Sequence, residues 1–354
     1  MRFLPGLTLV IASVSMVDAF KPASRRPSLQ SISSVTAGEA TALRACALGW
    51  ASIGVASFSG PSARAIVSDC FDLQTATFED NVREPAAGLL ELFAPLLPLE
   101  AGLLIALAGS VALSAEDRSR MGGAVGLTSA GVAATFAIGV ASGLPVTNGA
   151  AVGGVVALAL ATAALGWSAG SAVEKPLELY KRDAQDLVSV ESPLDLFNAN
   201  DVSTFYRSST LVGLLVGSAF AFSPVSPIAV FDEELPVTHM LRQDVGVFIV
   251  ALLSPIQAAL FRAARDGTLG EQMTRQLNTL TGVAISLLVL DGKAQVEIGT
   301  AAFGALPPDS PLRALVASGD PSRPEANTTA AFSVGLLVAC VYLYQAAFNR
   351  EQAR

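Results

Sequence analysis

Charged residues are scarce in this chain, and histidine is almost absent. Asp, Glu, Lys and Arg make up 15% of the 354 residues, against about 25% in an ordinary soluble domain, so most of the surface cannot face water. The single histidine, His239, excludes a pair of histidine haem ligands and any H-E-x-x-H zinc site. Three cysteines without metal-binding spacing exclude a disulfide framework, and we expect no metal site.

The chain also lacks a dense run of Lys and Arg. Its formal net charge of −8 disfavours a nucleic-acid partner. None of the short motifs that bind nucleotides or activate a nucleophile is present. We therefore assign no catalytic residue, expect no enzymatic activity and leave any cofactor unnamed.

Apolar residues are what the chain has in abundance. They make up 52% of the sequence, with 30 glycines and only 6% aromatics, and the mean hydropathy is +0.54. This composition predicts small-residue helix packing in lipid. The expected fold class is all-α, a polytopic membrane protein with six or seven transmembrane helices and the lipid bilayer as its surroundings.

The positions of the spans follow from the length of the apolar runs, because a helix needs about 20 apolar residues to cross a bilayer. Spans are expected at 93–114, 121–144, 148–169, 209–231, 245–264 and 329–348. The region 277–306 holds two shorter apolar pieces and forms either one stretched span or a re-entrant hairpin. All of these belong to a single membrane domain, 66–354, with a polar segment at 174–207.

The first 65 residues have the composition of a targeting leader. Residues 1–19 form an apolar stretch that ends in Val-Asp-Ala, as in a signal peptide cleaved before Phe20. Residues 20–44 are rich in Ser and Arg with one acid, as in a transit peptide. Residues 45–65 are apolar and end in an A-x-A motif, as in a thylakoid transfer segment; the alternative is apolar presequence or a first span.

This arrangement resembles the plastid-targeting presequences of algae with complex red-lineage plastids, in which a Phe follows the signal cleavage site. The resemblance implies a plastid membrane, the thylakoid, with the mature N-terminus near Ile66 in the lumen. The loop charges agree, because most Lys and Arg residues then lie on the stromal side, where the polar segment 174–207 also falls. Six-span and seven-span versions differ only in the side of the C-terminus.

Glycines spaced four residues apart predict close helix contacts in the second to fourth spans, where we expect a tight three-helix core. The pairs are Gly122/Gly126, Gly139/Gly143, Gly149/Gly153, Gly166/Gly170 and Gly213/Gly217.

Three polar residues within apolar segments are candidates for an intramembrane site, because polar groups in lipid are costly and point to function by default. Glu100 lies either well inside the first span or in the first turn of a span that begins after Pro95 and Pro98, and we favour the second interpretation. Gln257 follows a proline kink and either bonds a freed carbonyl or lines a site. Glu297 approaches a cavity if 277–306 is re-entrant, and is solvated if it is a loop.

The expected function is that of a structural or assembly subunit in thylakoid membranes, packed against a photosynthetic complex. Light-harvesting antenna proteins carry a Glu five residues before an Arg in their spans. No Glu stands five residues before either Arg of "LFRAARDGTL", so no pigment ligand is assigned. The alternative is a transporter or channel for a small solute or ion, with a path built from helices broken at Pro224 and Pro255. An intramembrane enzyme ranks third. His239, near three acids at 232–234, is expected to be an ordinary loop residue.

Overall fold

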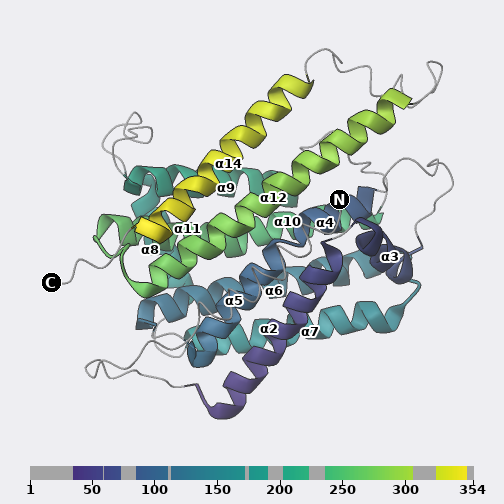
Figure 1. Ribbon diagram of the computed structural model, residues 1–354. Helices are drawn as coiled ribbons and strands as arrows, with labels where there is room; N and C mark the ends of the chain where they lie inside the picture. Colours follow the sequence, from purple (N-terminus) through teal and green to yellow (C-terminus); the bar gives the residue numbers. More distant parts are fainter. Residues whose placement is uncertain are drawn as a thin grey trace.

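The computed structural model describes residues 35–58, 60–72, 85–110, 113–171, 175–189, 202–222, 236–305 and 324–348. These residues form helices packed as a bundle, with α12 and α14 side by side along it (Figure 1). No strand occurs within these ranges; Phe71 and Val146 form one isolated bridge. The helices are α2 (Ala37–Ser57), α3 (Gly60–Cys70), α4 (Pro85–Phe93), α5 (Leu96–Ile105), α6 (Ala115–Ala141), α7 (Gly149–Ser171), α8 (Pro176–Val188), α9 (Val202–Phe222), α10 (Pro236–Phe248), α11 (Ser254–Arg265), α12 (Gln272–Ala305) and α14 (Pro324–Phe348). Two π-turns, η1 (Ala106–Ser110) and η3 (Ile249–Leu253), follow α5 and α10.

The helices confirm the predicted polytopic membrane fold. Within the described residues, five apolar stretches are long enough to cross a bilayer: Ala86–Gly109, Ala115–Ala141, Gly149–Ser171, Val202–Phe222 and Pro236–Arg265. A sixth arises if α2 and α3, bent by 114°, count as one span, and α14 contains a shorter apolar piece, Ser333–Phe348.

Two spans occupy the centre of the bundle. In the most apolar part of Ala86–Gly109, 89% of the residues are buried, and in Pro236–Arg265 72% are buried. Phe93 and Phe248 join the two spans through an edge-to-face contact with ring centroids 4.5 Å apart. By the same measure only 22% of α7 and 28% of α9 are buried, so these two helices lie at the periphery.

The first span does not begin where its prolines suggested. It starts at Ala86 and comprises both α4 and α5, which a turn at Ala94 and Pro95 separates. Pro95 stands just before α5 with φ −65°, a value that a helix accepts. Glu100 therefore lies about 21 Å along the span by the rise per residue, and our placement of it in the first turn is corrected.

The region 277–306 lies within one continuous helix, α12, which runs from Gln272 to Ala305. The two short apolar pieces are therefore joined through Asp291 and Lys293 without a turn. The side chain of Glu297 lies outside the described residues.

Glycines at the crossing of α6 and α7 bring the two main chains into contact. A Cβ added to Gly122 would lie 2.5 Å from the main-chain oxygen of Gly166 and 2.5 Å from the Cα of Gly170. Ser119 adds a hydrogen bond across the same crossing, donating from Oγ to the Gly170 carbonyl at 2.6 Å. Close backbone approach of this kind is how helices associate in lipid.

Gly126, the second member of the predicted Gly122/Gly126 pair, makes a looser contact than its partner. A Cβ added to Gly126 would lie 3.2 Å from the main-chain nitrogen of Trp167 and 3.3 Å from the Trp167 Cβ, against 2.5 Å at Gly122. The main-chain nitrogen of Gly126 also lies 3.1 Å from a Cβ added to Gly166, so both glycines of the predicted pair lie at the crossing with α7, and the approach is closest at Gly122. The reason is that crossing helices are closest at one point and separate along their axes on either side of it.

The other predicted glycine pairs have different surroundings. Gly213 and Gly217 face α11 and the η3 turn, so α9 packs on α10 and α11, and the three-helix core of the second to fourth spans is not what forms. Gly139 has ordinary contacts with Leu144 and Met240, and Gly143 ends α6 with φ +88°. Gly149 and Gly153 have open space where a Cβ would stand.

Replacing Gly122 by valine is expected to destabilise the protein by about 1–3 kcal/mol, because main-chain atoms of α7 cannot move aside as a side chain would. Gly153→Ala in the neighbouring helix meets no atom and should be neutral, or stabilising by up to about 1 kcal/mol through helix propensity. Thermal unfolding of both variants in mild detergent measures the difference. Equal stability of the two would show that α6 and α7 do not cross at Gly122.

Helix α2 belongs to the core, although its residues fall in the predicted leader. Trp50 is 1% exposed and donates from Nε1 to Thr162 Oγ1 of α7 at 3.0 Å. Leu43 and Ala47 are buried on the same face. Removal of residues 45–65 would leave this face of the bundle uncovered, which favours a mature chain that retains α2.

Candidate functional site

Glu100 is fully buried inside the first span. Its side chain is 0% exposed, and it accepts a short hydrogen bond from the Ser129 hydroxyl of α6. Its second carboxyl oxygen, Oε2, has no hydrogen-bond partner. A carboxyl held only by a hydroxyl is a group that can take up a proton or a cation within the membrane.

Asp244 is a second buried carboxyl that bonds a hydroxyl of α6. It lies in α10, is 1% exposed, and accepts a short hydrogen bond from the Thr135 hydroxyl of α6. Sequence reasoning missed it, because the apolar run was taken to begin at 245, after the last charge. The apolar residues Val237, Met240 and Val245 keep a helical spacing across the charged positions, and this spacing is the signal that would have found Asp244.

The two carboxyls share a local design. Each bonds a hydroxyl on α6, and Ser129 and Thr135 stand about 9 Å apart along that helix. Each is also followed within one or two turns by a π-turn, η1 after Glu100 and η3 after Asp244. π-Turns interrupt the regular hydrogen-bond ladder and are frequent at functional sites.

Gln257 lies in a separate polar cluster, formed with residues of α9 and α14. It donates from Nε2 to Ser209 Oγ of α9 at 2.9 Å, and Ser209 also shares a hydrogen bond of 2.9 Å with the Tyr342 hydroxyl of α14. The main-chain carbonyl at the kink, that of Ile249, is bonded by Ser254 Oγ at 2.9 Å. Gln257 is therefore a side-chain contact between helices, and its partners differ from those of Glu100.

Arg242, another buried charge in α10, caps the end of α9. It is 1% exposed and donates from Nη1 to the Phe220 carbonyl at 2.8 Å, and its Nη2 lies 3.0 Å from His239 Nδ1. His239 stands in the first turn of α10, while the acids at 232–234 lie outside the described residues.

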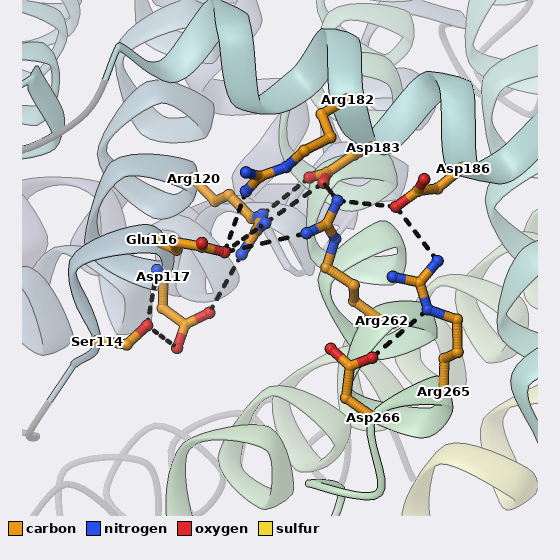
Figure 2. A network of polar contacts seen from close by, with 10 residues as sticks. All are labelled: Ser114, Glu116, Asp117, Arg120, Arg182, Asp183, Asp186, Arg262, Arg265 and Asp266. Atoms are coloured by element: carbon orange, nitrogen blue, oxygen red, sulfur yellow. Dashed lines mark hydrogen bonds and ion pairs between the residues drawn. The ribbon is translucent and has the colours of Figure 1, made fainter.

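One end of the bundle carries a group of charges that we name the ion-pair cluster (Figure 2). It consists of Glu116, Asp117, Arg120, Arg182, Asp183, Asp186, Arg262, Arg265 and Asp266. Asp183 of α8 is at its centre and is 5% exposed. Arg120 Nε of α6 and Arg262 Nη2 of α11 contact the Asp183 carboxylate at 2.8 and 2.7 Å.

The remaining pairs of the cluster tie α8 to the same two helices. Asp186 of α8 binds Arg262 at 2.9 Å and Arg265 at 3.3 Å, both in α11, and Arg182 of α8 binds Glu116 of α6 at 3.2 Å. These charges come from segments that the charge rule placed together, and the contacts gather them at one end of the bundle.

Tyr180 fixes α8 to α6 beside the cluster. Its hydroxyl donates to the Arg120 carbonyl at 2.5 Å, and the same hydroxyl would lie 2.8 Å from a Cβ added to Gly123. Burial, reinforced by the nearby Asp183, raises the pKa of the Tyr180 hydroxyl, so this hydroxyl remains a donor throughout the physiological pH range.

No group of three or more metal-ligating side chains occurs within the described residues. Fold and polar sites together define the class as a polytopic helical membrane protein with buried carboxyls in two of its spans. Comparison with protein-family models, with curated proteins and with solved structures finds no match for this chain.

Proposed function

We propose that the protein is a transporter for a small solute, coupled to a proton or cation bound at Glu100 and Asp244. The supporting observation is that these two carboxyls lie in the two central spans and both bond hydroxyls of one helix, α6. Binding or release of a proton changes the hydrogen bond that each carboxyl makes to α6 and so couples the occupancy of the carboxyls to the position of that helix.

Two further features support transport. Both central spans contain π-turns, where a helix can change register at low cost. The ion-pair cluster joins α6, α8 and α11 at one end of the bundle. Transport by alternating access needs such a closure at each end of the path.

Glu100→Gln and Asp244→Asn are each expected to abolish proton flux in vesicles that contain the purified protein and an internal pH dye. The amides keep the shape of the carboxyls but carry no exchangeable acid proton, so flux should fall to the rate of protein-free vesicles. Ser129→Ala should reduce flux, whereas Thr128→Val, which removes a buried hydroxyl without a partner, should not. Wild-type flux in both acid variants would refute the proposal.

The second candidate is a structural or assembly subunit. The outward faces of α7 and α9 support it, since Leu160, Trp167 and Leu215 are 56%, 37% and 73% exposed and offer an apolar surface to a membrane partner such as a photosynthetic complex. Native gel electrophoresis separates the candidates: a transporter migrates alone, and an assembly subunit migrates with its complex.

The location that we propose is a plastid membrane, the thylakoid; the lumenal N-terminus expected from the sequence requires cleavage after Ala65, which would remove α2. The support is the leader composition of the residues that precede α2 and the gathering of Arg120, Arg182 and Arg262 on one side, which the charge rule makes the stromal side. Imaging of a C-terminally tagged chain tests the compartment.

A further inference from the structure

The polar cluster around Gln257 contains no charge. Hydrogen bonds and ring contacts join Tyr206 and Ser209 of α9, Gln257 of α11, Asn278 of α12 and Tyr342 of α14. With Thr281, which is buried one turn after Asn278 on the same face of α12, we name this group the neutral cluster. All of its members except Ser209 are at most 2% exposed. Tyr206 donates to Asn278 Oδ1 at 2.5 Å, which links the α12 side of the cluster to α9.

Three polar atoms of the neutral cluster have no hydrogen-bond partner: Gln257 Oε1, Asn278 Nδ2 and Thr281 Oγ1. Buried polar groups are almost always hydrogen-bonded, so three such atoms in one cluster require an explanation. They are an acceptor, a donor and a hydroxyl that can act as either. A molecule that satisfies them must itself both donate and accept hydrogen bonds.

The surroundings of these atoms select against an ion. No Asp, Glu, Lys or Arg belongs to the cluster, and a buried charge without a counter-charge is costly. The rings of Phe205, Tyr206 and Tyr342 meet edge to face with centroids 5.4 Å apart. These rings provide an apolar wall for the carbon skeleton of a bound molecule.

The ion-pair cluster lies at the same end of the bundle, just beyond the neutral cluster. Gln257 precedes Arg262 by five residues, about 7.5 Å along α11. Tyr206 is followed by Arg207, which donates to the Asp186 carbonyl at 3.4 Å and stacks over Phe261 at 4.9 Å. The neutral cluster is therefore separated from the aqueous end of the bundle by the charges that hold α8 in place.

We propose that the neutral cluster binds the transported solute, and that this solute is a small uncharged molecule with both hydrogen-bond donors and acceptors, a polyol or an amide. The assignment rests on the proposed transport function. It gives the two polar regions separate tasks: Glu100 and Asp244 bind the coupling ion, and Gln257, Asn278 and Thr281 bind the solute.

Binding can be measured apart from transport by saturation-transfer NMR on the full chain in lipid nanodiscs. Glycerol and urea serve as uncharged probes, and acetate and methylammonium as charged probes of similar size. The uncharged probes should bind and the charged ones should not. Asn278→Leu and Gln257→Met should each weaken binding about fivefold, the loss expected for one hydrogen bond.

Thr281→Val keeps the shape of its side chain and tests the site even if the amide variants fold poorly. It should also weaken binding, whereas Thr128→Val, an equally buried threonine of α6 with an unpartnered hydroxyl, should bind as the wild type does. The solute site is refuted if the wild type binds none of the uncharged probes, if the charged probes bind as well, or if Thr281→Val binds unchanged.

The two proposals fail in different ways. Proton flux through Glu100 and Asp244 without probe binding removes the solute site and leaves the coupling site. Probe binding that depends on Asn278, without proton flux, supports the solute site and removes the coupled transport.

Discussion

Trp50→Ala is expected to lower the free energy of unfolding by about 3–5 kcal/mol, the usual cost of truncating a large buried aromatic side chain. Trp50 is 1% exposed, bonds Thr162 of α7, and meets the Phe248 ring edge to face at 6.4 Å. Its loss opens a cavity between α2, α7 and the central span. Leu48→Ala, two residues away on α2 and 70% exposed, should change stability by no more than about 0.5 kcal/mol.

The measurement is reversible unfolding of both variants in mild detergent, together with the mass of the mature protein. A mature chain that retains Ala37–Ser57 and a large difference between the variants would agree with the position of α2. Cleavage after Ala65, with Trp50→Ala indistinguishable from wild type, would restore the predicted thylakoid transfer segment at 45–65. The two results exclude each other, because a removed helix cannot contribute to stability.

Asp183→Ala should cost about 2–3 kcal/mol, because it removes the carboxylate that Arg120 and Arg262 share and leaves each of them only its more exposed partners. The side chains of Arg120 and Arg262 are only 5% and 14% exposed, and both contact Asp183 within 2.8 Å. The matched control is Asp266→Ala in the same cluster. Its pair with Arg265 is 3.4 Å long between side chains that are 55% and 47% exposed, so it should cost about 0–1 kcal/mol.

The dependence on ionic strength also distinguishes the ion pairs of Asp183 from the ion pair of Asp266. Raising the ionic strength should weaken the effect of Asp266→Ala through screening and leave that of Asp183→Ala nearly unchanged. The measurement is unfolding at low and high salt. Equal small effects for both substitutions would show that α8 is not held by the buried pairs and that the ion-pair cluster is a surface feature.

The fold class could be predicted from composition, because a chain this apolar must hide its main-chain polar groups in helices within lipid. The boundaries of the spans were harder. Pro95 looks like a helix end in sequence, yet it stands at the start of α5, where a missing N–H costs nothing. Whether a proline ends or merely bends a span depends on what packs around it.

The polar sites were only partly predictable. Glu100 stands out in an apolar run, whereas Asp244 lies among Arg242 and other polar residues. The burial of Asp244 and Arg242 is visible only in the structure, where α10 packs against α6 and α9.

Glycine spacing found a helix crossing but not the roles of the individual glycines. It predicted Gly122, Gly126 and Gly153 alike, yet main chains overlap at Gly122, Gly126 meets Trp167 at a longer distance, and Gly153 lies open. Spacing along one helix gives a stripe of small residues, but where another helix crosses that stripe is decided by the packing of the whole bundle.

Long-range pairing in the ion-pair cluster could not be read from the sequence. Arg120 and Asp183 are 63 residues apart, and they meet only because α8 folds back over the ends of α6 and α11. The charge rule assigns such residues to a side of the membrane but gives no partners.

The length of α12 has a mechanical consequence. Its 34 residues extend about 51 Å, and the hydrocarbon layer is only about 30 Å thick. Even tilted by about 40°, near the upper limit for such helices, the rod still spans about 39 Å across the layer. A helix of this length that crosses the layer must therefore extend beyond it. Helix α12 packs side by side with α14 (Figure 1), and because it is one continuous helix, it joins Asn278 and Thr281 directly to the turns that lie outside the layer.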